Sequence, residues 1–225
     1  MRPVPFSEIQ ALEPKSQVVR RMRNDPKVLL HEDGRVFKVV RSKIRLRLSG
    51  FGRRSKRFAV NCRRLAAREI DCPKLLEILR VTDRDLHVVV YEPLAGRTAR
   101  EIFAETDDCS PMALRLARYV ALLHDRGVYF AGGHTDNYIV QPNGEFGIID
   151  IQDSWVLPMP LNAIHRALSF RILLKYPEDR AALSVDGKLK PFVDTYLDAT
   201  RLGRIGRYLF MTTLRLRLPE LYQQL

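Results

Sequence analysis

The feature of the sequence that most constrains its fold is a short hairpin pattern between helix-like segments. The apolar runs "YIVQ" and "FGIID" flank "PNGE" within residues 138–150, and the Asn-Gly pair favours a type I′ turn. Asn137 and Asp150 stand at the two ends of this pattern, thirteen positions apart. Because so short a hairpin brings its ends together, we expect both side chains to face one site.

The sequence before this hairpin predicts a small sheet that carries one main helix. Apolar runs around a glycine-containing turn predict a β-hairpin in 27–41, and helical spacing of apolar residues predicts a helix over 57–70. Continuous apolar runs up to residue 92 predict two further strands. The stretch 1–26 favours an irregular or helical lead-in, and the basic, glycine-containing stretch 42–57 favours a mobile connection.

The sequence after a hinge-like segment at 93–96 is mainly helical. Ser110 as an N-cap and Pro111 at the first helical position predict the start of a long helix, and Gly127 predicts its end. We therefore predict an α+β, bilobal fold, with a β-rich N-lobe over 1–92 and a mainly helical C-lobe over 93–225.

Three polar residues in this arrangement suit phosphoryl transfer from a nucleotide. Lys38 lies within the apolar strand "VFKVV", where an amine is costly unless it meets an anion, which makes it a candidate clamp for nucleotide phosphates. An outward-facing strand lysine is the alternative. Asn137 and Asp150 would supply the sparse pair of protein oxygens that Mg²⁺ prefers, unless they are only a turn asparagine and a helix-capping aspartate.

Charge adds an anionic partner to these expectations. The net charge is +12, and residues 1–60 carry sixteen Lys or Arg against five Asp or Glu, a net +11. Such a basic face fits nucleotide phosphates, an anionic glycan or lipid, a membrane surface or nucleic acid. The arginines that we consider for gripping an anionic acceptor, with a solvated face as the alternative, are Arg45, Arg47, Arg53, Arg54 and Arg57.

The sequence also predicts where the protein acts. No apolar run reaches the roughly 18 residues of a membrane helix, and the stretch "MRPVPFSEIQALEPK" lacks an apolar core of signal-peptide length. Cys62, Cys72 and Cys109 have no metal-ligand spacing and fit reduced thiols. We expect a cytoplasmic protein and, in addition, peripheral contact with the inner face of the membrane.

Several motifs together resemble the lipopolysaccharide kinases, the Kdo and heptose kinases of the protein-kinase-like superfamily. They are "VFKVV", "LHDRGVYFAGGHTDNYIV", "GIIDIQD", "REIDCPKLLEI" and "VVVYEPLAG", and the likeness extends from about residue 27 to 180. It implies a protein-kinase-like fold that uses ATP and Mg²⁺ on a sugar of lipopolysaccharide core. It also implies that Lys38 is the strand-three lysine, Asn137 the catalytic-loop asparagine and Asp150 the metal aspartate, with the backbone from Glu92 to Leu94 holding adenine.

The chain departs from this family pattern at positions that matter for chemistry. Gly132 stands where an aspartate precedes the asparagine by five positions, Phe130 stands where a histidine is usual, and Asn61 stands where a helix glutamate would pair with the lysine. The phosphate-covering loop is only "HEDGR", with one glycine. Since glycine cannot accept a proton, we consider His134 and Asp136 as substitutes. The alternative for His134 is a structural histidine that packs the loop, and the alternatives for Asp136 are a third metal ligand or a residue that hydrogen-bonds within the loop.

Three functions compete on this evidence from the sequence. The first is an ATP-dependent kinase of an envelope glycan. The second is a pseudokinase, a nucleotide- or glycan-binding scaffold that lacks the catalytic aspartate, which Gly132 and Asn61 favour. The third is a basic nucleic-acid-binding protein, which charge alone favours, because no recognisable DNA- or RNA-binding motif accompanies the charge.

Overall fold

The computed structural model describes residues 1–22, 24–41, 44–47 and 50–225. The chain forms two compact units. The N-terminal unit comprises Met1–Leu94 together with Ile151–Asp153, and the C-terminal unit comprises Ala95–Asp150 and Ser154–Leu225. The three residues that follow Asp150 therefore pack with the first unit, although the chain on both sides of them belongs to the second.

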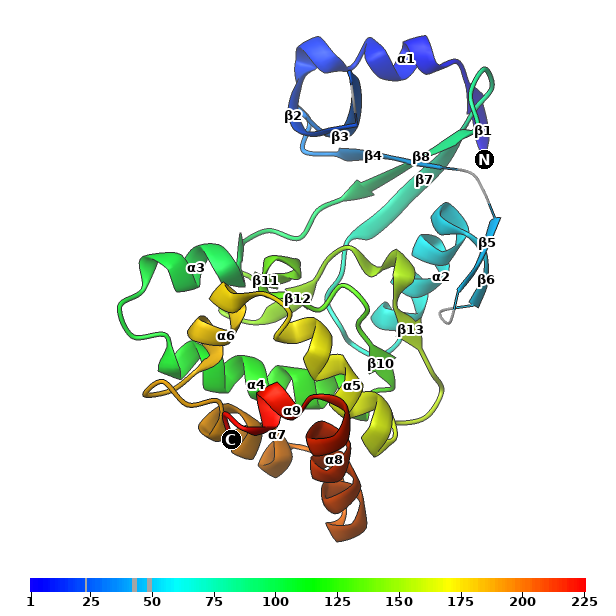
Figure 1. Ribbon diagram of the computed structural model, residues 1–225. Helices are drawn as coiled ribbons and strands as arrows, with labels where there is room; N and C mark the ends of the chain where they lie inside the picture. The colour runs from blue at the N-terminus through cyan, green and yellow to red at the C-terminus, as the bar shows by residue number, and fades with distance from the viewer. Residues whose placement is uncertain (23, 42–43, 48–49) are drawn as a thin grey trace. The chain divides into compact units, whose positions relative to one another are not determined.

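The N-terminal unit is built on a six-stranded sheet (Figure 1). Its strand order is β1 (Arg2–Val4), β7 (Lys74–Val81), β8 (Leu86–Glu92), β4 (Val36–Arg41), β3 (Asp25–His31) and β2 (Ser16–Met22). Each neighbouring pair is antiparallel except β1 and β7, which are parallel. The predicted β-hairpin of 27–41 and the predicted strands before residue 92 are confirmed.

One face of this sheet carries a cluster of buried apolar side chains. In β4, Phe37 and Val39 are buried in it together with Leu29, Leu79 and Val88. Side chains alternate between the faces of a strand, so Lys38, between Phe37 and Val39, belongs to the opposite face. The strand lysine therefore lies on the face opposite this cluster, beside its cross-strand partner Val89, which is also buried.

The first 26 residues differ from the predicted lead-in. They contain the helix α1 (Phe6–Gln10) and the 3₁₀ turn η1 (Glu13–Lys15), but also the strands β1 and β2 at opposite edges of the sheet. Phe6 and Ile9 are buried in the sheet core, which holds this segment in place. The sequence did not predict strand β2, because "SQVVRRM" shows no regular alternation and its pairing with β3 is decided by tertiary contacts.

The basic stretch 42–57, predicted as a connection, contains regular structure. It contains an antiparallel pair, β5 (Ile44–Arg47) and β6 (Gly50–Arg53), and the main helix α2 (Arg54–Ala66) follows directly. The parts of that prediction that fall on residues 42–43 and 48–49 lie outside the described residues. Within α2, Phe58, Cys62 and Leu65 are buried, so the predicted helical spacing is confirmed, although the helix begins three residues earlier than predicted.

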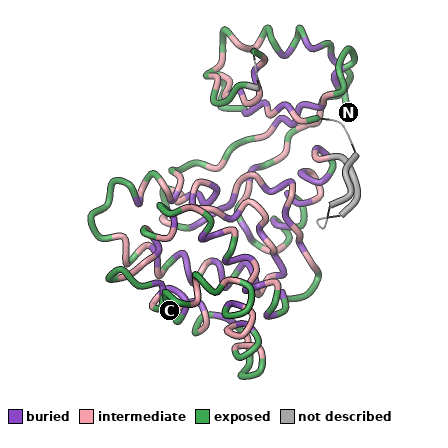
Figure 2. The backbone as a smooth tube through the Cα atoms, viewed as in Figure 1, coloured by how far each residue is buried: buried purple, intermediate pink, exposed green. Residues whose placement is uncertain are grey.

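The C-terminal unit is mainly helical (Figure 1). Its helices are α3 (Ala99–Glu105), α4 (Ser110–Asp125), α5 (Ala163–Leu173), α6 (Pro177–Leu183), α7 (Lys190–Ala199), α8 (Arg204–Arg217) and α9 (Pro219–Tyr222). Short strands connect them: β9 (Arg97–Thr98), β10 (Val128–Tyr129), β11 (Tyr138–Val140), β12 (Phe146–Ile148) and β13 (Trp155–Val156). Helix α4 packs on α7, α5 packs on α8, and buried residues run along α4 in Figure 2.

The ends of α4 show which local signals hold. Ser110 is the first helical residue, and Cys109 is the N-cap with no side-chain cap bond, so the predicted Ser110 cap is wrong by one position. Gly127 follows the helix with φ +77°, as the predicted glycine stop requires. A Cβ at Gly127 would lie 2.5 Å from the carbonyl oxygen of Leu157, so close packing also requires glycine there.

The α+β class predicted from the sequence is confirmed: a β-rich N-terminal unit with one main helix and a mainly helical C-terminal unit. Among the described residues, no helix combines the length and the apolarity that crossing a bilayer demands.

Candidate functional site

The β11–β12 hairpin brings its two ends together as predicted. Tyr138 pairs with Ile148, and one residue further out the Ile149 amide donates to the Asn137 carbonyl oxygen at 3.0 Å. Asp150 is therefore the next residue after a hydrogen-bonded pair that contains Asn137. The ladder fixes the separation of the two backbones at the open end of the hairpin.

The turn of this hairpin is not the predicted type I′. A type I′ turn needs positive φ at both central residues, and of this pair only Gly144 has it, at +84°. The Gly144 amide donates to the Gln141 carbonyl oxygen at 2.8 Å, and the Gln141 amide donates to Glu145 at 2.9 Å. The loop is thus three residues long, with Pro142 and Asn143 forming the turn and Gly144 the left-handed residue.

Asp150 has an unusual backbone conformation. Its φ is +58°, in the left-handed region that asparagine and aspartate tolerate better than most residues. It follows the buried residue Ile148 by two positions and is itself partly exposed. Sparsely populated backbone conformations concentrate at functional sites, and Asp150 shares this feature with two other non-glycine residues of the described chain, Glu69 and Asp186.

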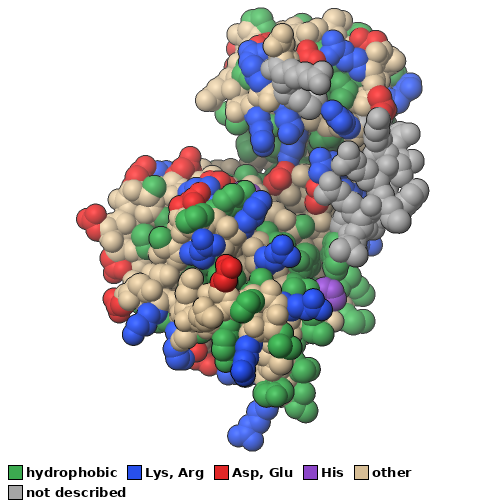
Figure 3. All heavy atoms as spheres, viewed as in Figure 1, with side chains coloured by type: hydrophobic (Ala, Val, Ile, Leu, Met, Phe, Trp, Pro, Cys, Tyr) green, Lys and Arg blue, Asp and Glu red, His purple; other side chains and the backbone are tan. Residues whose placement is uncertain are grey.

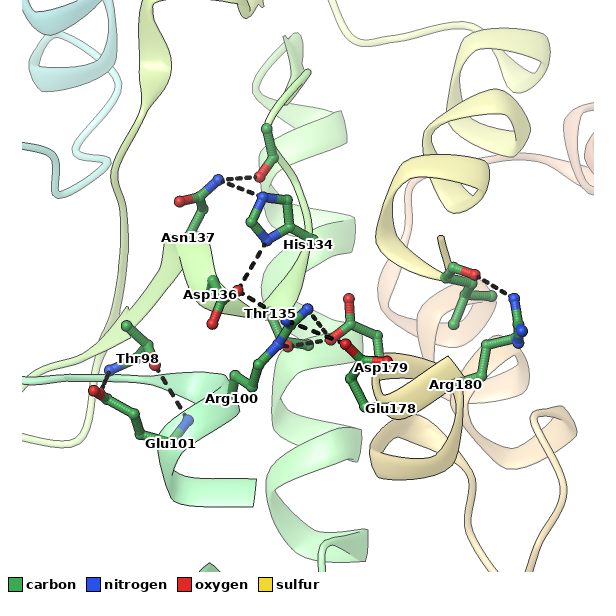
Figure 4. Close-up of polar contacts among 12 residues, drawn as sticks. Thr98, Arg100, Glu101, His134, Thr135, Asp136, Asn137, Glu178, Asp179 and Arg180 are labelled. Atoms are coloured by element: carbon green, nitrogen blue, oxygen red, sulfur yellow. Dashed lines mark hydrogen bonds and ion pairs between the residues drawn. The ribbon is translucent and has the colours of Figure 1, made fainter. Parts of the chain in front are cut away.

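The side-chain amide of Asn137 has a defined orientation (Figure 4). Its Nδ2 donates to the Gly132 carbonyl oxygen at 2.7 Å and lies 3.0 Å from Nε2 of His134. Since a carbonyl oxygen can only accept, the amide nitrogen must face Gly132. Oδ1 consequently points away from both contacts, as Figure 4 shows. The residue is buried, with 8% exposed, so the loop around it holds this orientation.

His134 serves as a partner of Asn137. Because Asn137 donates through Nδ2, Nε2 of His134 must accept, which places the imidazole proton on Nδ1. Burial lowers the pKa of His134, and the charges of Asp136 and Asp179 only partly oppose this effect. Within the described part of the chain Nδ1 has no hydrogen-bond partner; it lies 3.7 Å from Oδ2 of Asp136. The ring is therefore neutral at pH 7, with the Nε2 lone pair directed at Asn137.

Asp136 is engaged by an arginine that the sequence did not single out. Its Oδ2 lies 2.9 Å from Nη1 of Arg100, a residue of α3. The carboxylate is partly exposed, at 43%, and the guanidinium occupies one of its oxygens. Any role for Asp136 as a proton acceptor would have to compete with this ion pair.

Arg100 connects the loop 132–137 to helix α6 (Figure 4). Its Nε donates to Oγ1 of Thr135 at 3.2 Å, and its Nη2 pairs with Oδ1 of Asp179 at 2.8 Å. Thr135 and Asp179 are buried, and Thr135 also donates to Asp179. The guanidinium lies over the Tyr176 ring, 5.1 Å from its centre. Arg100 thus contacts the loop at Thr135 and Asp136 and holds it against α6 through Asp179.

Gly132 contributes no side chain to this loop, and the neighbouring groups leave limited room for one. A Cβ there would lie 3.1 Å from Nδ2 of Asn137 and 3.4 Å from the Asp150 carbonyl oxygen. The two predicted metal ligands and Gly132 are therefore adjacent. At Gly133 a Cβ would lie 2.9 Å from the Phe130 carbonyl oxygen, so that position admits only glycine without a backbone shift.

Lys38 belongs to the N-terminal unit and contacts the segment that follows Asp150. Its Nζ donates to Oε1 of Gln152 at 3.3 Å. The 3₁₀ turn η3 (Ile151–Asp153), which contains this glutamine, packs on α2. The Lys38 side chain is thus partly buried, and one of its hydrogen-bond partners is the uncharged amide oxygen of Gln152.

Helix α2 holds the same segment through Asn61. The residue is buried, and its Nδ2 donates to the Ile151 carbonyl oxygen at 2.7 Å. Two arginines that the sequence assigned to an acceptor or to solvent, Arg54 and Arg57, both pair with Asp153. The Arg54 pair has an N–O distance of 2.8 Å. These two arginines are therefore structural in this unit.

The residues predicted to hold adenine lie where the N-terminal unit ends. Glu92 is the last residue of β8, and its side chain pairs with Lys74 at 3.2 Å. Leu94 is the last residue of the unit. The predicted role in holding adenine uses the backbone groups of this stretch. The ion pair of Glu92 with Lys74 involves only side chains and does not engage those backbone groups.

The oxygens of Asn137 and Asp150 suit a hard cation that keeps several waters. In the described residues, His, Cys, Asp and Glu side chains form no group of three or more that could hold a metal. Mg²⁺ with a nucleotide needs fewer protein ligands than that, because substrate phosphates and waters complete its octahedron. The donor set therefore fits Mg²⁺ bound together with phosphates.

Comparisons with known proteins give no family assignment. No family model matches the chain, and no curated protein matches it. Among solved structures, a chain of the bifunctional kinase-methyltransferase WbdD matches with 15% sequence identity and a TM-score of 0.42. The match covers 83% of this chain and 47% of that chain, so the chain spans less than half the length of the structure it matches.

Proposed function

We propose that the protein is an ATP- and Mg²⁺-dependent, protein-kinase-like phosphotransferase that acts on a sugar of lipopolysaccharide core or a related envelope glycan. The observation that carries the proposal is the orientation of Asn137. Its Nδ2 is held by Gly132 and His134, and its Oδ1 points out of the loop beside the hairpin end that leads to Asp150. An amide fixed in this way suits a metal ligand better than a turn residue.

The proposal gives each residue a separate task. Asn137 and Asp150 hold Mg²⁺, which when bound supplies charge neutralisation at the transferred phosphoryl group. Lys38 binds the α- and β-phosphates, for which its amine exchanges the neutral Gln152 oxygen. The backbone from Glu92 to Leu94 binds adenine. The site of action is the cytosolic face of the inner membrane, where the protein makes peripheral contact.

Proton transfer from the acceptor hydroxyl is the step with the least support from side chains. Gly132 has none to offer, and Arg100 engages Asp136. His134 is neutral and could accept a proton on Nε2, but only if Asn137 gives up its contact there. Phosphoryl transfer through a loose transition state depends mainly on positioning and electrostatics, so the proposal assigns the loop a positioning role first.

The pseudokinase scaffold is the second candidate, and a specific observation favours it. The position of the expected aspartate is not only empty at Gly132 but bordered by Nδ2 of Asn137, 3.1 Å from where a Cβ would stand. A loop closed in this way can bind a metal–nucleotide complex without transferring phosphate. The two candidates therefore differ in turnover and not in nucleotide binding.

One experiment tests the metal site and then separates the two candidates. ATP binding is measured by calorimetry with and without Mg²⁺, for the native protein and for Asp150→Asn and Asp186→Asn. Both aspartates have left-handed backbones, with φ +58° and +52°, and asparagine tolerates that region, so Asp186→Asn is a matched control. We expect Asp150→Asn alone to lose most of the Mg²⁺-dependent affinity, about tenfold or more, as loss of a charged ligand predicts.

Turnover of ATP with core oligosaccharide then decides between enzyme and scaffold. Phosphorylated glycan, detected by mass spectrometry, supports the phosphotransferase. Mg²⁺-dependent ATP binding without any product supports the scaffold. Equal Mg²⁺-dependent affinity in Asp150→Asn and Asp186→Asn would refute the site assignment on which both candidates rest.

A further inference from the structure

The C-terminal unit contains a cavity of about 850 Å³ next to the loop 132–137. Tyr129 and Ala131 form part of its wall, and Ala131 directly precedes Gly132 in the chain. The rest of the wall comes from the end of α5, from α6, and from the junction of α8 and α9. Its volume lies within the roughly 300–1,000 Å³ of small-molecule sites. The cavity therefore has the size and the place of a substrate pocket.

The polar lining of this cavity is strongly cationic. It comprises Arg171, Lys175, Arg180 and Arg217, against a single acid, Glu220. Residues 61–225 as a whole contain 22 Lys or Arg (38 − 16) and 21 Asp or Glu (26 − 5), so this lining is not a consequence of a basic background. Figure 3 shows Lys and Arg side chains on the face of the C-terminal unit that carries α5 and α9.

Two of these cations have no carboxylate partner among the described residues and are available to bind an external anion. In the part of the chain that the structure describes, Arg171 and Arg217 form no ion pair with a carboxylate. Arg180 donates to the Leu174 carbonyl oxygen at 3.1 Å, which fixes its side chain at the wall. Four positive charges gathered around a single acid repel one another, and guanidinium groups match phosphate and carboxylate oxygens in a bidentate geometry.

The aromatic part of the wall adds a surface for a sugar ring. Tyr129 stacks on Trp155, with 4.9 Å between ring centres, so the ring is held rigidly. Burial raises the pKa of Tyr129, and the nearby positive charge of Arg171 opposes this shift. Small-molecule sites commonly combine such an apolar wall with a few charged groups that set orientation.

We propose that this cavity binds the acceptor sugar through a phosphate or carboxylate group on it, held by Arg171 and Arg217. The inference rests on the proposed function for the identity of the ligand as an acceptor. It moves recognition of the anionic partner from the basic residues 1–60 to the C-terminal unit. It also places the bound sugar beside Ala131 and hence at the loop that contains Gly132.

The test measures binding without any nucleotide. Trp155 is the single tryptophan of the chain and stacks on a wall residue, so its fluorescence reports occupancy. Glucose 6-phosphate, glucose and inorganic phosphate are titrated separately into the native protein, Arg171→Gln, Arg217→Gln, the double variant and Arg215→Gln. Arg215 is an exposed arginine in the same last turn of α8 but outside the cavity wall, which makes it a matched control.

We expect glucose 6-phosphate to bind and glucose not to bind. The double variant should weaken binding by at least about tenfold, as loss of charge-assisted hydrogen bonds predicts, and Arg215→Gln should change it less than about twofold. Inorganic phosphate should bind more weakly than the sugar phosphate, because it lacks the ring. Thermal unfolding checks that the variants, all at exposed positions, remain folded.

Two outcomes would overturn the inference. Equal weakening by the double variant and by Arg215→Gln would mean that general surface charge, not the cavity, attracts the anion. Displacement of glucose 6-phosphate by ATP would make the cavity a nucleotide site. The binding titrations contain no ATP, so they test the cavity independently of phosphate transfer. If the protein binds the sugar phosphate in this cavity but never phosphorylates a glycan, the proposed function is wrong and the anion site remains.

Discussion

Removal of the Arg100 side chain should destabilise the C-terminal unit, because it leaves a buried carboxylate without its cation. Asp179 is 1% exposed, and Oδ1 pairs with Nη2 of Arg100 at 2.8 Å. Within the described residues, Oδ2 has no hydrogen-bond partner. Breaking one side of a buried pair costs about 3–5 kcal/mol. Since the Arg100 side chain is 27% exposed, Arg100→Gln should lower the free energy of unfolding by about 3 kcal/mol, the low end of that range.

The reverse substitution should cost less. In Asp179→Asn, Oδ1 can still accept from Thr135 and Arg100, and an amide group replaces the oxygen that has no partner. Arg100 keeps Asp136 and Glu178 as ion-pair partners. We expect a loss of about 1 kcal/mol, typical of one hydrogen bond. With the buried charge removed, Arg100→Gln should then also cost about 1 kcal/mol, so the coupling between the two residues is about 2 kcal/mol.

Urea unfolding followed by the fluorescence of Trp155 measures these values, because Trp155 lies in the same unit as both residues. Arg97→Gln is the control: Arg97 pairs with Glu105 on the surface of the same unit, and such pairs contribute little, so the midpoint should not move. The reasoning fails if Arg100→Gln costs no more than Asp179→Asn. It fails equally if the two costs add in the double variant.

The remaining predictions concern one histidine and two glycines. Burial lowers the pKa of His124 to about 3, so between pH 6.5 and 3 only the unfolded chain takes up this proton; stability should fall as the pH drops, by about 2 kcal/mol between pH 6.5 and 5, and urea unfolding of His124→Gln should show a shallower pH dependence. Gly127→Ala should lower the unfolding free energy by more than about 1–2 kcal/mol, the cost of a left-handed residue, because its Cβ would also lie 2.5 Å from Leu157; an unchanged denaturation midpoint would contradict this. Gly132→Ala should leave stability within about 1 kcal/mol but weaken Mg²⁺-dependent ATP binding in calorimetry, since its Cβ would displace the Asn137 amide; unchanged binding would show that Asn137 is not the ligand.

Local patterns in the sequence were enough to place the hairpin and its two polar ends. A hairpin ladder depends on residues close in the chain, so the approach of Asn137 to Asp150 follows from the strand pattern alone. The alternation of "VFKVV" likewise separates Lys38 from the core. The turn type was not predictable from Asn-Gly alone, because Pro142 fits the first turn position and shifts glycine to the left-handed one.

Contacts between distant segments could not be read from the sequence. Arg100 and Asp179 are 79 positions apart, and Lys38 and Gln152 are 114 apart. Arg100 stands in a short helix with a capping box at Thr98 and has the pattern of any helix-surface arginine. Only the folded unit shows that the guanidinium of Arg100, on α3, connects the loop 132–137 to α6. No spacing rule links residues so far apart in the sequence.

Asn61 shows that a departure from a family pattern can have its own structural reason. The resemblance places a glutamate at this position to pair with the lysine, and its absence favoured a pseudokinase. In the structure, however, the position must supply a donor, because the Asn61 side chain binds the Ile151 carbonyl oxygen at 2.7 Å. An ionised carboxylate only accepts hydrogen bonds and could not do this, whereas an amide can. The bond fixes the residue that follows Asp150, while the hairpin fixes the residue before it through Ile149 and Asn137. The departure from the family pattern at Asn61 therefore has a structural reason within the N-terminal unit. Of the two departures on which the scaffold proposal rests, Gly132 then carries the greater weight.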